Sequence, residues 1–297
     1  MRSGETVSLS AESTRDMTID HLAPVTAAPN ANKALWEKGD FTRIAASMRE
    51  AGDALVDTLA VIPSMEVLDL GCGDGTTAVP AARRGARVLG IDIAANLVAA
   101  GNARARDAGL SNLFFREGDA SHLDGIEDDR FHLVISIFGA MFAPKPFDVA
   151  REMVRGTRPG GRIVMGNWIP GDPTLVAQIL KISGEYTAPP PEGFVSPVSW
   201  GVVDNVEERF AAAGIPPDAI SCAPTLYTFR SPNPPAALLD TFRRYYGPTM
   251  NAFDAAEKDG RAGELYDRLS TLFDAQNEGG AGETVISANF LKVVVIK

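Results

Sequence analysis

Residues 67–75 read Val-Leu-Asp-Leu-Gly-Cys-Gly-Asp-Gly, and this stretch decides the fold. Its first four residues are typical of a short strand buried in a parallel sheet. Three glycines follow at alternate positions, Gly71, Gly73 and Gly75. Glycine lets the backbone turn sharply and approach a ligand closely. A strand that ends in such a turn and opens into a helix is typical of nucleotide-binding α/β sheets.

Strands and helices alternate on both sides of this stretch. Predicted strands lie at 66–70, 87–91, 113–117, 131–137, 161–167, 220–229 and 285–296. Predicted helices lie at 41–59, 76–84, 94–108, 145–157 and 200–214. This alternation predicts an α/β fold, a doubly wound and mostly parallel seven-stranded sheet with helices on both faces. Pro80 lies inside the second of these helices, where it removes a backbone donor.

The sequence predicts one large domain, 33–297, behind an N-terminal arm, 1–32, that is rich in Ser, Thr, Ala and Pro and is expected to be mobile. Segment 171–200 has many prolines and is expected to cross the carboxyl edge of the sheet as an irregular segment. Segment 231–284 shows helical spacing and is expected to form a cap inserted before the last strand. Both segments are therefore predicted cap elements.

Composition excludes several classes of protein. The 297 residues include 28 Lys and Arg against 38 Asp and Glu, a formal net charge of −10, which disfavours a nucleic-acid partner. The two cysteines show no disulfide or metal-site spacing, so no metal is expected. Neither a secretory signal nor an apolar run long enough to span a membrane is visible. These features predict a cytoplasmic protein, while the oligomeric state stays open.

Three acidic residues stand at the ends of the first three predicted strands. Asp69 lies two residues before the first glycine, where a carboxylate can reach a ligand ammonium group. Asp92 comes about 20 residues after the glycine loop, where it can accept hydrogen bonds from ribose hydroxyls. Asp119, within Gly118-Asp119-Ala120, can accept a hydrogen bond from an adenine amine. Such a trio suits a cationic adenosyl ligand.

Each of these features also has a purely structural explanation. A Gly-x-Gly-x-Gly run is often only a turn, Asp92 could cap a helix, and Asp119 could close a turn. A dinucleotide fingerprint requires a third glycine where this chain has Thr76, so a nicotinamide cofactor is disfavoured. The order and spacing of all three acidic residues favour the adenosyl ligand.

The stretch resembles motif I of the class I S-adenosylmethionine-dependent methyltransferases, a resemblance that covers about residues 33–170. It implies S-adenosylmethionine as cofactor and S-adenosylhomocysteine as product. The residues that it implies at the cofactor are Asp69 at the methionine amine, the backbone of Gly71, Cys72 and Gly73, Asp92 at the ribose, Ile93 and Leu97 against the adenosine, Gly118, Asp119 and Ala120 at the adenine, and Ser136 and Phe138 beside the sulfonium.

Two further segments resemble the ubiquinone and menaquinone biosynthesis methyltransferase-like subgroup, methyltransferase type 11. These are residues 138–144, Phe-Gly-Ala-Met-Phe-Ala-Pro, and the lead-in helix at 36–44, whose aromatic residues Trp36 and Phe41 would close over the cofactor or simply pack in the core. The subgroup usually has Phe-Asp where this chain has Phe131-His132, and an acidic residue where it has Lys145. Both departures put a transfer of substrate identity in doubt.

The predicted function is methyl transfer to an O, N or C atom of a small, partly apolar molecule. Met141, Trp168, Tyr245 and Tyr246 are the predicted acceptor residues. No catalytic residue is assigned, because in-line methyl transfer depends largely on alignment and needs a base only when the acceptor must lose a proton. The alternatives are an S-adenosylmethionine-binding protein of the same fold that transfers no methyl group and, less favoured, an NAD-dependent oxidoreductase.

Overall fold

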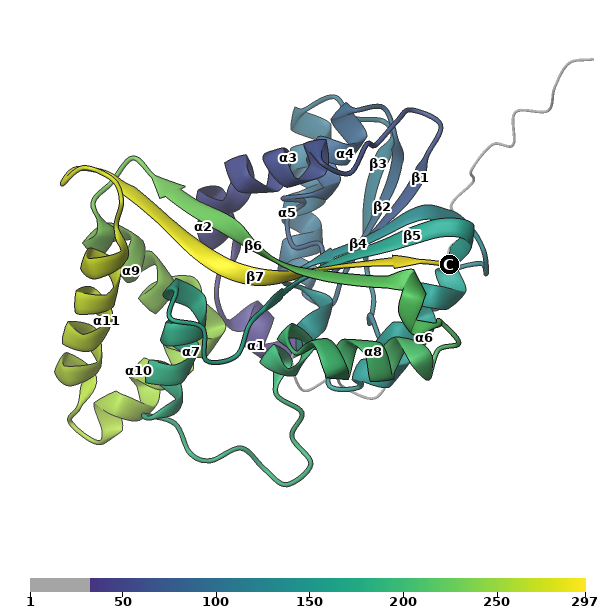
Figure 1. The fold of residues 1–297 in the computed structure, drawn as a ribbon. Helices are drawn as coiled ribbons and strands as arrows, with labels where there is room; N and C mark the ends of the chain where they lie inside the picture. Colours follow the sequence, from purple (N-terminus) through teal and green to yellow (C-terminus); the bar gives the residue numbers. More distant parts are fainter. Residues whose placement is uncertain (1–32) are drawn as a thin grey trace, which may run out of the picture.

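The computed structural model describes residues 33–297, so the arm expected at 1–32 lies outside the described residues. Seven strands form one sheet (Figure 1). They are β1 (Glu66–Leu70), β2 (Arg87–Asp92), β3 (Leu113–Glu117), β4 (Phe131–Ile137), β5 (Thr157–Trp168), β6 (Ile220–Ser231) and β7 (Thr284–Ile296).

The strand order is β3-β2-β1-β4-β5-β7-β6. The first five strands of this order run parallel, whereas β7 is antiparallel to both β5 and β6. Strand β1 lies between β2 and β4, and its residues Val67, Leu68 and Leu70 are fully buried because helices cover both faces. The predicted seven-stranded, mostly parallel α/β sheet is therefore confirmed.

Helices cover the two faces of the sheet. On one face lie α3 (Arg49–Asp57), α4 (Ala78–Arg83) and α5 (Ala95–Asp107), and on the other lie α6 (Pro146–Gly156) and α8 (Val203–Ala211) (Figure 1). The predicted 41–59 helix is divided into α2 (Thr42–Ala45), a 3-10 turn η1 (Ala46–Met48) and α3. None of the described helices is long and apolar enough to cross a membrane.

Pro80 lies in the first turn of α4 and not in its interior, where the sequence placed it. The helix starts at Ala78, two residues later than predicted, so Pro80 is its third residue. The first four backbone N–H groups of a helix have no partner within it, and a proline at this position therefore removes no helical hydrogen bond.

A second difference concerns the proline-rich segment, which contains the regular helix α7 (Leu175–Gly184). Its prolines lie before and after the helix, so they do not interrupt it. Leu175, Val176 and Ile179 are buried and give the helix an apolar side. The rest of the segment contains the short 3-10 turn η3 (Pro197–Gly201), and the helix predicted at 200–214 is α8, which begins only at Val203.

Three helices join β6 to β7: α9 (Pro235–Tyr245), α10 (Gly247–Lys258) and α11 (Ala262–Gln276). They pack against one another and against α7, beyond the end of the sheet (Figure 1). The short helix α1 (Lys33–Lys38) contacts both α10 and α5. It therefore connects the helical insertion to the part of the sheet that carries the glycine loop. The remaining 3-10 turns are η2 (Ala140–Phe142) and η4 (Pro217–Ala219).

Candidate functional site

The glycine loop after β1 has the backbone conformation that only glycine adopts without strain. Gly71 and Gly73 have φ values of 63° and 55°. A Cβ atom on Gly71 would come within 2.5 Å of the Cα atom of Gly139, so this glycine is needed where the two loops touch. A Cβ atom on Gly73 would meet only Phe41, at 4.0 Å. Gly73 therefore borders open space.

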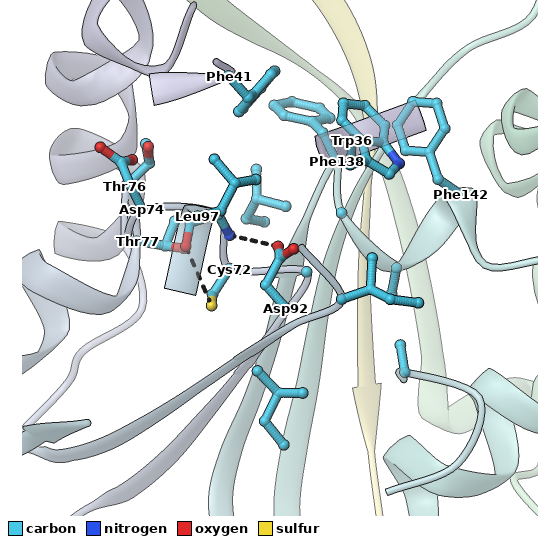
Figure 2. Close-up of a pocket in the computed structure, with 18 of the residues that line it drawn as sticks. Trp36, Phe41, Cys72, Asp74, Thr76, Thr77, Asp92, Leu97, Phe138 and Phe142 are labelled. Atoms are coloured by element: carbon cyan, nitrogen blue, oxygen red, sulfur yellow. Dashed lines mark hydrogen bonds between the residues drawn. The ribbon is translucent and has the colours of Figure 1, made fainter. Parts of the chain in front are cut away.

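That space is a cavity at the carboxyl ends of β1, β2, β3 and β4 (Figure 2). Its empty volume, open solvent included, is about 930 Å³. The lining residues are Trp36, Phe41, Met48, Gly71, Cys72, Gly73, Asp74, Thr76, Thr77, Ile91, Asp92, Ile93, Leu97, Gly118, Asp119, Ala120, Ile137, Phe138, Gly139, Ala140, Phe142, Ala143 and Tyr227. All the predicted cofactor residues except Asp69 and Ser136 are among them.

Asp92 at the end of β2 fixes the glycine loop as well as lining the cavity. Its two carboxylate oxygens accept hydrogen bonds from the backbone N–H groups of Gly73, at 2.8 Å, and Ala94, at 2.9 Å. Burial raises the pKa of this carboxyl group, while the backbone hydrogen bonds act in the opposite direction. Each oxygen has a further lone pair for a ligand hydroxyl. Asp92 can therefore accept hydrogen bonds from ribose hydroxyls while its carboxylate also holds the glycine loop.

The loop after β3 supplies Gly118, Asp119 and Ala120 to the cavity. One Asp119 oxygen accepts hydrogen bonds from the backbone N–H of Ser121, at 2.8 Å, and from its hydroxyl, at 2.7 Å. The turn that the sequence offered as an alternative role for Asp119 is thus present. The same residue lines the cavity, so the two roles coexist.

Asp69 does not line the cavity, contrary to the predicted contact with a ligand amine. It is fully buried, and its carboxylate accepts a hydrogen bond of 2.5 Å from the Thr77 hydroxyl. Thr77, its hydrogen-bond partner, lies on the cavity wall. Burial, with a smaller contribution from the charge of Asp92, raises the pKa of Asp69 to about 7. Asp69 is therefore only partly ionised at neutral pH.

This raised pKa predicts a pH-dependent stability. The pKa of Asp69 is about 7 in the folded chain, above the usual value near 4 that applies to the unfolded chain. Between about pH 4 and pH 7 the folded chain therefore keeps a proton on Asp69 that the unfolded chain has released. The free energy of unfolding should therefore fall as pH rises through this window, by up to about 4 kcal/mol. In Asp69→Asn this contribution should be missing.

Urea unfolding of the wild type and Asp69→Asn at pH 5, 6, 7 and 8 measures the effect, because all other titrating groups are common to both chains. The stability of Asp69→Asn relative to the wild type should rise with pH. A difference between the two chains that stays constant over this range would show that Asp69 is ionised throughout.

A pair of arginines that the sequence analysis missed holds Asp74, in the middle of the glycine loop. Arg49 from α3 lies 2.9 Å from one carboxylate oxygen, and Arg104 from α5 lies 3.2 Å from the other. Arg104 also donates a hydrogen bond of 2.6 Å to the Asp74 carbonyl. Asp74 itself is fully buried. Arg49 and Arg104 come from separate helices, so no local spacing in the sequence marks them as partners.

Aromatic side chains form the opposite side of the cavity. Trp36 from α1 packs edge-on against Phe142, with ring centroids 4.8 Å apart, and against Phe41, at 5.7 Å (Figure 2). Tyr246 lies behind them, 6.0 Å from Trp36, and is buried. Trp36 and Phe41 therefore pack with their neighbours and line the cavity at the same time, so both roles considered from sequence apply.

Five other predicted site residues do not line the cavity. Ser136 is buried, because its hydroxyl donates to the Leu70 carbonyl at 2.7 Å and accepts from the Ala140 N–H at 2.9 Å. The other four are the predicted acceptor residues Met141, Trp168, Tyr245 and Tyr246. Met141, Trp168 and Tyr246 are buried in the core, outside the cavity lining.

Trp168 instead supports the cavity wall from behind. Its ring stacks on Phe138 with centroids 3.6 Å apart and an interplanar angle of 6°. The lining residue that replaces it is Tyr227, in the edge strand β6. Sequence reasoning missed Tyr227 because its segment reads only as a strand. Met48, Thr77 and Phe142 also line the cavity and were not predicted; Thr77 and Phe142 lie in or beside segments with a motif, but no individual role was assigned to them.

Comparisons with known proteins agree on one family. A family described as "Methyltransferase domain" matches residues 67–161. An uncharacterized protein of Mycobacterium tuberculosis (strain ATCC 25618 / H37Rv) is 32% identical over 80% of this chain and 82% of its own length. Methyltransferase GfsG of Streptomyces halstedii is 36% identical, over 40% of this chain and 45% of its own.

Among solved structures, phosphoethanolamine N-methyltransferase 2 of Haemonchus contortus, in complex with phosphomonomethylethanolamine and S-adenosylhomocysteine, is similar with a TM-score of 0.53 and 16% identity. The match covers 84% of this chain and 53% of that one. At this level of identity the likeness concerns the fold.

Proposed function

Because this chain belongs to the class I S-adenosylmethionine-dependent methyltransferases, we propose that it methylates a small, partly apolar molecule in the cavity beside the glycine loop. The observation that carries this proposal is the cavity itself, in which one side is formed by the loops after β1, β2 and β3 and the other by aromatic side chains. A polar side suits the cofactor, and an apolar side suits the acceptor.

The residues present fit S-adenosylmethionine. Gly73 leaves a space that any Cβ substituent would enter, so the cofactor can lie directly against the loop backbone. Asp92 would hold the ribose hydroxyls, and the 118–120 loop would meet the adenine. Ile93 and Leu97 would pack on the adenosine. Bound there, the cofactor supplies a methyl group on a cationic sulfur.

Thr77 takes over the role that the sequence assigned to Asp69. Its hydroxyl donates to the buried Asp69 carboxylate, so the lone pairs of the Thr77 oxygen can only accept a hydrogen bond from the cavity. A ligand ammonium group is such a donor. The positive charge would also lower the pKa of Asp69 from about 7 and favour its ionised form.

Thr77→Val tests this arrangement, because it keeps the shape of the side chain and removes the hydroxyl. The affinity for S-adenosylhomocysteine should fall by about tenfold, roughly 1.4 kcal/mol, the cost of one hydrogen bond in a charged network. 5′-Methylthioadenosine lacks the amino-acid tail, so its affinity should stay unchanged. Calorimetry measures both ligands, with the exposed Thr271→Val as the matched control. An equal loss for both ligands would place Thr77 outside the ammonium contact.

The helical insertion would shelter the acceptor. Segments 171–200 and 231–284 supply α7 and α9–α11, and α10 contacts α1, whose Trp36 lines the cavity. We propose that these segments act as a cap on the acceptor side. A covered site of this kind suits a small molecule better than a polymer.

Methyl transfer needs only alignment of donor and acceptor in this site. Held by the glycine loop, Asp92 and Asp119, S-adenosylmethionine would supply the methyl group: the acceptor atom would form the new bond to the methyl carbon, the carbon–sulfur pair would stay on sulfur, and a proton lost by the acceptor would pass to solvent. The residues of the chain bind both molecules and hold them at reacting distance, from which large rate accelerations follow.

The experiment is to incubate the full chain with S-adenosylmethionine and a panel of phenols, quinols and amines, and to measure the release of S-adenosylhomocysteine. Release that depends on one class of acceptor supports the proposal. Tight binding of S-adenosylmethionine without release for any acceptor would favour the alternative of a cofactor-binding protein that transfers no methyl group.

A further inference from the structure

A second hollow lies away from the glycine loop, between α3 and β6, the last strand of the sheet (Figure 1). We call it the edge groove. Residues within 50–58 line one side of it, residues within 225–230 line the other, and Lys292 of β7 completes it. Of these residues only Tyr227 also lines the cavity beside the glycine loop. The edge groove is therefore built from side chains that the cofactor site does not use.

The edge groove follows the free edge of β6. In the sheet β6 pairs with β7 alone, so one side of its backbone has no neighbouring strand among residues 33–297. Four consecutive residues, 225–228, line the groove, although successive side chains of a strand point to opposite faces. The groove therefore borders the backbone of β6 and not only one of its faces. Unpaired N–H and C=O groups along such an edge are a template for a further strand.

Pro224 shows which backbone groups of β6 point to its free side. It is the fifth residue of the strand, whose register with β7 has no bulge, so its nitrogen, which carries no hydrogen, lies on the free side. The direction of the backbone groups alternates along a strand, and those of Leu226 and Thr228 therefore point the same way. An added strand can pair with Leu226 and Thr228, and its pairing ends at Pro224. The Leu226 side chain is 62% exposed.

Charged side chains stand at the two ends of the edge groove. At one end Arg230 forms an ion pair of 3.0 Å with Glu50 of α3. At the other end the Lys292 ammonium group donates to the Thr58 hydroxyl at 3.3 Å, and it has no carboxylate partner among residues 33–297. In the register of β6 and β7, Lys292 lies opposite Ala223, one residue beyond the proline. The one unpaired charge of the groove is therefore positive.

We propose that the edge groove binds the carboxyl-terminal segment of a partner polypeptide, which adds to β6 as an antiparallel strand and places its terminal carboxylate on Lys292. A strand antiparallel to β6 begins beside Arg230 and reaches Lys292 last, so its negative terminus meets the unpaired ammonium group. Ala51 and Ala54 on α3 are small and leave room for an apolar side chain of the peptide. Main-chain hydrogen bonds supply the affinity in this mode of binding, and side-chain contacts supply the preference.

A pentapeptide of sequence Thr-Val-Thr-Val-Val, acetylated at its N-terminus, tests the proposal on the full chain by calorimetry. It is compared with the same peptide ending in an amide and with Thr-Pro-Thr-Pro-Val, whose prolines cannot donate to a strand ladder. We expect the free acid to bind about tenfold more tightly than the amide, because its carboxylate accepts a charge-assisted hydrogen bond. The proline peptide should not bind.

Leu226→Pro removes an N–H group on the free side of β6 and should lower the affinity for the free acid at least about tenfold. Leu226→Thr keeps this N–H group, and its affinity should stay unchanged as the matched control. Lys292→Met keeps an unbranched side chain without the charge, and it should bind the free acid and the amide equally. Thermal unfolding verifies that the variants fold. If Leu226→Pro does not fold, the comparison of acid and amide in Lys292→Met decides.

Equal affinity of the wild type for the free acid and the amide would overturn the proposal, as would unchanged binding in a folded Leu226→Pro or no binding of the free acid. Sedimentation that shows a stable dimer of the wild type, dissociated by Leu226→Pro, would also overturn it, because a second copy would then cover the edge. All three variants should bind S-adenosylhomocysteine as the wild type does. A wild type that binds the peptide without binding S-adenosylhomocysteine would contradict the proposed function alone.

Discussion

Gly73→Val should abolish cofactor binding in a chain that remains folded. The Cβ atom at this position meets only Phe41, at 4.0 Å, so the two added methyl groups would project into the cavity where the adenosyl group is expected. Calorimetry with S-adenosylhomocysteine should show a loss of more than about 1,000-fold, roughly 4 kcal/mol. No other substitution considered for this chain is expected to have a larger effect on binding.

The control for Gly73→Val is Gly109→Val, because Gly109 also has a positive φ, 65°, and has no atom within 4 Å of its Cβ position. Both substitutions force a side chain into the left-handed region, at a cost of about 1–3 kcal/mol in the free energy of unfolding. Urea unfolding should show a similar loss for the two variants. Retained binding in Gly73→Val would mean that the ligand does not lie against this loop.

Asp92→Ala should weaken the binding of S-adenosylhomocysteine by about 100-fold, roughly 3 kcal/mol. Two effects add. The ribose hydroxyls lose a charged acceptor, and the backbone N–H groups of Gly73 and Ala94 lose the partner that holds the loop. The expected loss therefore exceeds that of a single ligand hydrogen bond.

Asp107→Ala, at the exposed end of α5, is the matched control for Asp92→Ala and should bind normally. Calorimetry measures the affinity of both variants, and urea unfolding measures the cost of the orphaned N–H groups, about 1–3 kcal/mol for each buried group. An Asp92→Ala chain that loses stability but keeps its affinity would show that Asp92 serves the loop alone.

Asp69 and Thr77 show what the motif at the end of β1 could predict about the site and what it could not. The sequence correctly identified an acidic residue at the end of the first strand and a cavity beside it. It could not show that the side chain turns away from the cavity and accepts a hydrogen bond from a residue eight positions later. The expected trio of anions is thus one buried, partly protonated carboxyl group and two carboxyl groups on the wall.

The predicted acceptor residues lie outside the cavity lining for a related reason. Trp168 does end a strand at the carboxyl edge of the sheet, as expected. The ring of Phe138 lines the cavity in front of it, however, and stacks on the Trp168 ring with centroids 3.6 Å apart. Tyr246 similarly lies behind Trp36 and Phe41. The position of these residues along the chain predicted that they lie near the cavity. Side-chain packing decided which rings line it.

The sequence by itself determined the positions of the strands along the chain, the glycine loop and the positions of Asp92 and Asp119, because these features depend on short-range periodicity and on turns that few residues can form. Only the tertiary structure decided that Tyr227 and the arginine pair on Asp74 belong to the site. Tyr227 faces the cavity because β6 pairs with β7 in a register that sets Tyr227 opposite Ala288. A shift of one residue would turn it to the other face, and nothing within β6 alone fixes that register.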